Sequence, residues 1–105
     1  MAESEFQKRR QEEERELQEF VRRLDALRKT YDRFFMGQEK ILPQPARDKL
    51  NRDFRASKLN KARNTSVKFR FQNLMMRLST YTSYWERQMR RIEDGSFRPG
   101  DPKTR

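Results

Sequence analysis

Cysteine and histidine are both missing from this 105-residue chain. Without cysteine there can be no disulfide framework and no thiolate metal site. Without histidine there is no imidazole base, so serine–histidine–aspartate and cysteine–histidine catalysis are excluded, along with the usual zinc ligands. The carboxylates that remain lie in helical patterns and imply no concave site. We therefore predict that the protein is not an enzyme and uses no cofactor, metal or small-molecule substrate.

Glycine and proline are scarce, with three and four copies, which favours long uninterrupted helices over turns and strands. The glycines stand alone at positions 37, 95 and 100, so a glycine-rich phosphate loop is excluded. No apolar run approaches the roughly 18 residues that cross a bilayer. The first ten residues also lack the apolar segment of a secretory signal. These absences lead us to expect a cytoplasmic protein.

Apolar residues are few as well. Only 32% of the residues are hydrophobic and 40% are charged, whereas a globular domain has nearly half apolar residues. This shortage leaves two options, a disordered chain or thin helices that share one apolar seam. Aromatic residues make up 11% of the chain, which argues against disorder. The composition therefore predicts an all-α fold, with a single helical domain over residues 1–95.

The first helix is expected over residues 4–36. Ser4 and Gln7 match a capping box, in which the two side chains bind free amides at a helix start. Apolar residues then recur every seven positions in two rows, which is typical of a coiled-coil seam. One row contains Leu17, Leu24 and Tyr31, and the other contains Phe20, Leu27 and Phe34. Gly37 is expected to end this helix.

Pro43 and Pro45 separate the first helix from the rest of the chain. A connector with a short helix is expected over residues 45–60, with apolar contacts from Leu50, Phe54 and Leu59. The last helix is expected over residues 64–94, although the pattern leaves open whether residues 46–94 form one helix or two. Its two rows contain Val67, Leu74 and Tyr81, and Phe71, Leu78, Trp85 and Ile92. Residues 96–105 are rich in proline and glycine and are predicted to be a disordered tail.

The two seams predict an antiparallel coiled-coil helical hairpin formed by the first and last helices. In this arrangement Leu17 faces Trp85 and Phe34 faces Val67, and the short connecting helix lies across the end. Glu12, Glu13 and Glu14 then lie beside Arg87, Arg90 and Arg91, a complementary pairing of charges. The rival arrangement is a plain two-helix hairpin that bends at residues 37–45. Either hairpin alone buries little apolar surface, so a second hairpin or another protein is expected to cover the remaining apolar side chains. A homodimer that forms a bundle is the simplest arrangement of this kind.

The chain carries a net charge of +10, which suggests an acidic partner. The excess is densest in residues 47–77, with ten bases and two acids. Candidate phosphate contacts in this stretch are Lys58, Lys61, Arg63, Lys68 and Arg70, with Phe69 as a surface for stacking a base. The competing interpretation is a solvated helix face whose long basic side chains pack along the seam. A nucleic-acid-associated protein is therefore the alternative functional prediction.

The preferred functional prediction is a protein–protein interaction or scaffold module. Tyr84 lies off the heptad rows between Arg77 and Arg87, and tyrosine and arginine contribute strongly to protein interfaces. Met75 and Met76 are also candidate contacts, because methionine adapts to varied surfaces. The competing interpretation of the methionines and of the aromatic residues at seam positions is that they fill the core.

One set of segments occurs in a fixed order along the chain: residues 31–37 (YDRFFMG), Glu39-Lys40, residues 63–65 (RNT), residues 68–71 (KFRF), Leu74, Arg77, Tyr81, Tyr84-Trp85, Arg87 and residues 92–95 (IEDG). This ordered set resembles an uncharacterised family of small helical proteins of myxobacteria and related bacteria. The resemblance covers residues 24–98. It implies a module used in the bacterial cytoplasm and brings no assigned activity.

Overall fold

The computed structural model describes residues 4–100, and within this range the regular structure is entirely helical. Helix α1 spans Glu5–Phe35, α2 spans Gln44–Ala56, the 3-10 helix η1 spans Lys58–Lys61, and α3 spans Thr65–Glu93. The fold measures 61 × 21 × 20 Å along its principal axes. The all-α prediction is confirmed, and residues 46–94 form two α-helices with a break before Asn64, which caps α3.

The ends of α1 follow the expected chemistry. The Ser4 hydroxyl accepts a hydrogen bond from the Gln7 amide at 3.1 Å, and the Gln7 side chain accepts one from the Ser4 amide at 3.2 Å. This reciprocal pair is the predicted capping box. At the other end, Gly37 adopts a φ of +81°, a left-handed conformation that glycine adopts without steric penalty. The Gln38 amide then donates to the Arg33 carbonyl at 2.9 Å, which closes the helix end.

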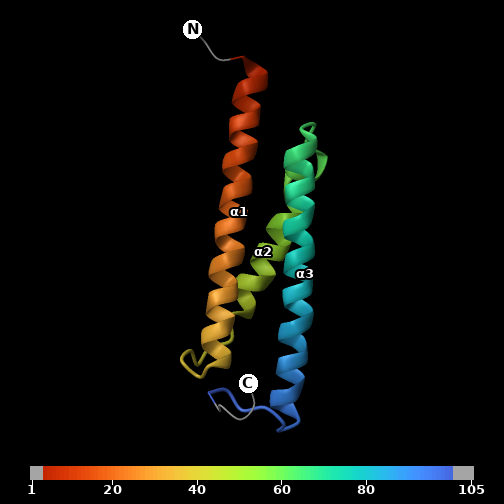
Figure 1. Cartoon of the computed structure of the whole chain (residues 1–105). Coiled ribbons are helices and arrows are strands. Elements are labelled where there is room, and N and C mark those ends of the chain that lie inside the picture. Colours follow the sequence, from red (N-terminus) through yellow and green to blue (C-terminus); the bar gives the residue numbers. More distant parts are fainter. Residues whose placement is uncertain (1–3, 101–105) are drawn as a thin grey trace.

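Helices α1 and α3 run in the same direction, so the predicted antiparallel pairing is wrong. Near the start of both helices, Glu14 forms an ion pair with Arg70 at 2.9 Å. Near the end of both, the Tyr31 and Trp85 rings stack with centroids 3.8 Å apart. Both helices therefore descend side by side in Figure 1. Leu17 does not face Trp85, and the acidic segment at residues 12–14 lies beside Arg70 rather than beside residues 87–91.

Helix α2 supplies the return path that a parallel pair requires. Asp53, late in α2, forms an ion pair with Arg23 of α1 at 2.8 Å. Beyond α2, the Ser57 hydroxyl donates to Glu16 at 2.8 Å. Helix α2 thus runs antiparallel to α1 and lies between α1 and α3 (Figure 1). The prediction that the short helix lies across the end of a hairpin is therefore wrong. The rival two-helix hairpin is wrong as well, because its second arm stops at Ala56.

The core is built around a layer of phenylalanine rings, one from each α-helix. The centroid of Phe20 lies 4.5 Å from that of Phe54 and 5.5 Å from that of Phe71, and Phe54 and Phe71 are 5.3 Å apart. Leu50 and Leu59 are buried beside this layer. The three apolar residues predicted in the connector are therefore all in the core, and Phe54 lies between α1 and α3 rather than across the end of a hairpin.

The C-terminal segment corrects a further prediction. Phe97 is only 5% exposed, packs edge-on against Phe35, and lies under the Arg91 guanidinium. The Gly100 amide donates to the Phe35 carbonyl at 3.0 Å. Residues 96–100 thus fold back onto the end of α1 and are not a disordered tail, while residues 101–105 lie outside the described part. Phe35 lies outside the two heptad rows and is covered by this segment of the same chain. Homodimerisation stays a prediction.

The direction of α3 can be tested with pairs of introduced cysteines, since the chain has none of its own. We expect Glu14→Cys with Arg70→Cys to form an intramolecular cross-link with a short bismaleimide, detected by peptide mass spectrometry. The ion pair that this change removes is partly exposed and contributes at most about 1 kcal/mol.

The matched control is Glu14→Cys with Arg87→Cys, which the antiparallel arrangement would bring together. In the parallel fold, position 87 lies about 26 Å further along α3 than position 70. Efficient cross-linking of this second pair, with none of the first, would contradict the fold.

Candidate anion-binding surface at the η1 end

The predicted phosphate contacts gather at the end of the fold where η1 meets the start of α3 (Figure 1). Lys58 and Lys61 belong to η1, Arg63 to the following loop, and Lys68 to the first turns of α3. Leu59 and Ala62 are buried and hold this segment against the core. Side-chain caps fix both helix starts: the Ser57 hydroxyl accepts from the Leu59 amide, and the Asn64 carbonyl oxygen accepts from the amides of Ser66 and Val67.

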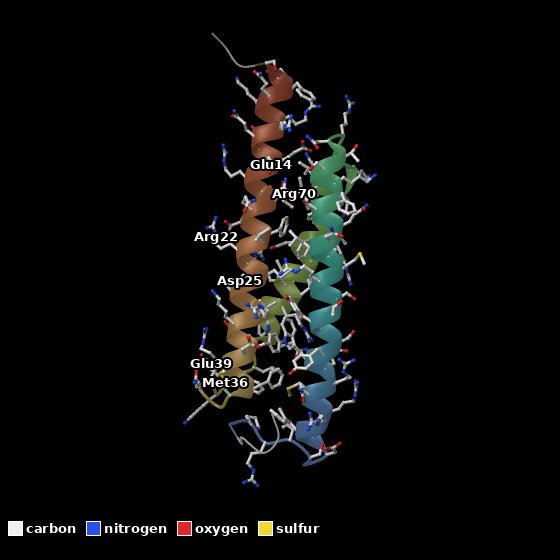
Figure 2. All side chains as sticks on the ribbon, viewed as in Figure 1. Glu14, Arg22, Asp25, Met36, Glu39 and Arg70 are labelled. Atoms are coloured by element: carbon white, nitrogen blue, oxygen red, sulfur yellow. The ribbon has the colours of Figure 1, made fainter. Side chains whose placement is uncertain are left out.

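The sequence that forms this end is free of acids. Residues 54–85 contain no aspartate or glutamate and seven bases, which are Arg55, Lys58, Lys61, Arg63, Lys68, Arg70 and Arg77. Compensating carboxylates must therefore come from other elements. Such a carboxylate reaches Arg70, whose Nη1 donates to both oxygens of Glu14 at 2.9 and 3.1 Å (Figure 2). Arg70 is thus tied to α1 and is not a free phosphate contact.

Of the other six bases of this segment, Arg77 contacts Tyr81, and five lie at or near η1. Arg55, Lys58, Lys61, Arg63 and Lys68 are exposed, and within residues 4–100 none of them forms an ion pair. We call this set the η1-end basic surface. Sequence reasoning did not single out Arg55, which stands at the end of α2; its place in the acid-free segment was the available signal. Unpaired like charges at one end of a small fold produce a positive potential that attracts anions.

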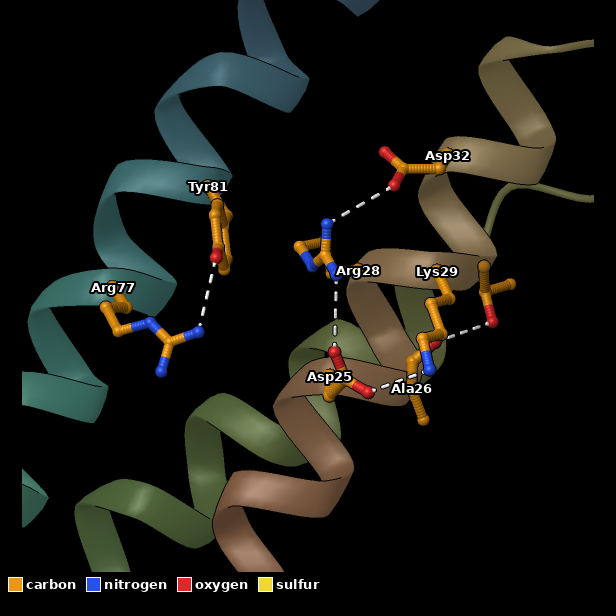
Figure 3. Close-up of polar contacts among 8 residues, drawn as sticks. Asp25, Ala26, Arg28, Lys29, Asp32, Arg77 and Tyr81 are labelled. Carbon is orange, nitrogen blue, oxygen red and sulfur yellow. Dashed lines mark hydrogen bonds and ion pairs between the residues drawn. The ribbon is translucent and has the colours of Figure 1, made fainter.

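The bases of α1 are arranged differently. Arg28 lies 3.4 Å from Asp25 and 3.7 Å from Asp32, and Lys29 lies 3.0 Å from Asp25 (Figure 3). These hydrogen bonds from Lys29 and Arg28 lower the pKa of Asp25 below its usual value. These two bases of α1 are therefore compensated by carboxylates on the same helix, in contrast to the bases of η1.

Phe69 lies on the same end with 61% of its surface exposed. It points away from the core, because the buried face of α3 is formed by Val67, Phe71, Leu74, Leu78 and Trp85. The residues three and four positions further along the same helix face are Gln72 and Asn73, both exposed. The η1-end basic surface is thus bordered by an exposed aromatic ring.

The residues predicted to bind a protein partner do not form one site. Met75 is partly buried beside α2, whereas Met76 is 67% exposed on the outer face of α3. Arg77 donates to the Tyr81 hydroxyl at 3.4 Å and lies over its ring (Figure 3). Arg87 is exposed.

Tyr84 is 44% exposed and borders a shallow hollow far from η1. This Tyr84 hollow is lined by Asp32, Phe35, Met36, Tyr84, Gln88 and Phe97. Phe97, which sequence reasoning assigned to a disordered tail, forms part of its wall. The hollow therefore depends on the folding back of residues 96–100.

Comparison with protein-family models, with curated proteins and with solved structures found no match to this chain. The resemblance to a myxobacterial family, and the cytoplasmic location that it implies, stay predictions. Within residues 4–100, no helix combines the length and the apolar character needed to cross a membrane. In the same range, no three acidic side chains are grouped closely enough to hold a metal ion.

Tyr31 is the buried residue with the most unusual polar environment. It is 1% exposed, and its hydroxyl makes no hydrogen bond within the described residues. Burial raises the pKa of Tyr31 above its ordinary value of 10.0, and the nearby Arg47 guanidinium opposes this rise. A raised pKa in the folded state stabilises the fold below pH 10, and this stabilisation is lost as the pH rises through the folded pKa.

We expect Tyr31→Phe to leave stability at pH 7 unchanged or to raise it by up to about 1 kcal/mol, because the hydroxyl is desolvated without a partner. The variant should also lose less stability than wild type above pH 10. Urea denaturation followed by circular dichroism between pH 7 and 11 measures both effects. The exposed Tyr84→Phe change is the control and should keep the wild-type pH dependence; an identical alkaline loss in Tyr31→Phe would contradict the assignment.

Proposed function

We propose that this protein is a non-enzymatic binding module that docks the phosphate backbone of a nucleic acid on its η1-end basic surface. The observation that carries this proposal is the set of five exposed, unpaired bases at one end of the fold, in a segment of 32 residues without an acid. A nucleic acid presents a regular row of negative charges, and each phosphate that a lysine or arginine neutralises releases condensed counterions.

The local structure supports binding with little reorganisation. The backbone of η1 and of the first turn of α3 is fixed by the Ser57 and Asn64 caps and by the buried Leu59. The basic side chains therefore project from a rigid support, which lowers the entropy lost on binding. Backbone contacts of this kind give affinities of about 1–100 μM at physiological salt, with a strong dependence on salt concentration.

Replacing Lys58, Lys61 and Lys68 together by glutamine tests this function. We expect binding to a fluorescent single-stranded DNA of about 16 nucleotides to weaken about tenfold or more, measured by anisotropy. The slope of log affinity against log salt concentration should fall by about 2, since each phosphate contact on a single strand contributes about 0.7.

The control variant replaces Lys29, Lys40 and Lys49 by glutamine, which removes the same charge from exposed positions outside the surface. It should bind nearly as wild type does and keep its salt slope. Equal losses in both variants would mean that only net charge matters, and the proposed surface would be wrong.

A second candidate function is protein docking at the Tyr84 hollow, which is consistent with an interaction or scaffold module. The observation that favours it is the exposure of two large side chains, Tyr84 and Met36, at 44% and 41%, around a depression. Tyrosine is enriched at positions that contribute strongly to protein interfaces. A module with a nucleic-acid site at one end and a protein site at the other would link the two partners.

Tyr84→Ala should leave helicity unchanged, because the side chain is half exposed, and should reduce recovery of protein partners in an affinity pull-down treated with nuclease. The matched control is Met76→Ala, which removes an exposed side chain elsewhere on α3. If Tyr84→Ala recovers the same partners in the same amounts as wild type, the hollow is not a docking site.

A further inference from the structure

We propose that the outer face of α3 beside the basic surface binds an unpaired base, with Phe69 as the stacking platform and Gln72 and Asn73 as hydrogen-bonding groups. This inference rests on the proposed function and narrows it, because it makes single-stranded nucleic acid the preferred partner. The juxtaposition that supports it is an exposed aromatic ring, two free amide side chains and a set of unpaired bases on one end of the fold.

The exposure of Phe69 has no explanation within the described fold. The residue is 61% exposed, while Phe20, Phe54 and Phe71 are 5% exposed or less. Among residues 4–100, no other ring packs against Phe69 and no guanidinium lies over it. An aromatic ring that stands free on a rigid helix can stack with any base, and each stacked base contributes roughly 1–3 kcal/mol to binding.

The surroundings of Phe69 fit a base better than an apolar partner. Residues three and four positions away on the helix are near neighbours on its surface. For Phe69 they are Thr65 and Ser66 on one side and Gln72 and Asn73 on the other. The amides of Gln72 and Asn73 make no side-chain hydrogen bond within the described residues, so their donors and acceptors are free for the edge of a base.

The positive charge around Phe69 favours an anionic partner. Lys68 adjoins Phe69, Lys61 and Arg63 lie just before α3, and no carboxylate occurs between residues 54 and 85. An acidic partner helix would need a row of apolar anchor sites at spacings of three, four and seven residues. Here Phe69 and Met76 are separated by amides, so that row is incomplete. A duplex hides the faces of its bases within the stack, whereas a single strand presents both phosphates and base faces.

The test compares two single strands of equal length, about 16 nucleotides, one with normal bases and one abasic along its whole length. The two probes carry the same phosphates, so their affinity ratio isolates the contribution of the bases. We expect wild type to bind the normal strand roughly 5- to 150-fold more tightly, the range given by stacking one base. Phe69→Ala should bring the ratio close to one and leave the salt slope unchanged.

The control is Ile41→Ala, which removes an exposed apolar side chain (76%) at the opposite end and should keep the wild-type ratio. Replacing Gln72 and Asn73 together by alanine should reduce any difference in affinity among oligo(dA), oligo(dC) and oligo(dT), and unchanged differences would remove the amides from the proposal.

Equal affinity for the normal and abasic strands in wild type would overturn the stacking inference and leave phosphate binding intact. Absence of binding to either strand at about 50 mM salt would overturn the proposed function as well. Tighter binding of a duplex, of polyglutamate or of anionic vesicles than of the normal strand would overturn the assignment of the partner.

Discussion

The layer formed by Phe20, Phe54 and Phe71 is the interaction on which the rest of the structure depends. Each ring comes from a different α-helix, and the centroids are 4.5–5.5 Å apart. With only 32% hydrophobic residues, the chain has few other contacts that join all of these helices. Removing a buried phenylalanine typically costs roughly 3–5 kcal/mol, a large share of the 5–15 kcal/mol that stabilises an ordinary domain. By drawing α2 between α1 and α3, this layer also fixes the direction in which α3 must run.

The sequence predicted the helices well and their direction wrongly, for a physical reason. Local signals such as the Ser4 capping box and the prolines before α2 act within a few residues, and the structure contains them. A heptad row has the same spacing in either direction, so Leu17 and Phe20 fit a parallel or an antiparallel neighbour equally well. The charge pattern did not reveal the direction of α3 either, because bases occur near both of its ends. Glu14 pairs with Arg70 near the start of α3 and not with residues 87–91 near its end. The deciding contacts come from Leu50, Phe54 and Leu59, whose weak periodicity did not reveal how deeply they are buried.

The sequence predicted which residues the candidate sites contain, but not how those residues are arranged in space. The basic stretch and the aromatic residue within it could be read directly, and the structure gathers Lys58, Lys61, Arg63 and Lys68 at one end. Successive residues on a helix point about 100° apart, so neighbours in sequence such as Met75 and Met76 end on different faces. Ion pairing between distant elements was also invisible, which is why Arg70 was counted as free. Phe97 was missed because proline and glycine around it suggested disorder, although its burial closes the Tyr84 hollow.

Helix direction and surface charge are linked in this fold. In the predicted antiparallel arrangement, residues 12–14 would have lain beside Arg87, Arg90 and Arg91, and the start of α3 would have met the neutral aromatic end of α1. In the parallel arrangement the acidic segment of α1 approaches the start of α3, yet Glu14 is aligned with Arg70 on the side that faces α1. The bases of η1 and Lys68 lie on other sides and stay exposed and unpaired. The fold therefore uses a carboxylate to anchor one arginine between helices and leaves the remaining positive charge facing outward, beside Phe69, where an anionic strand can reach it.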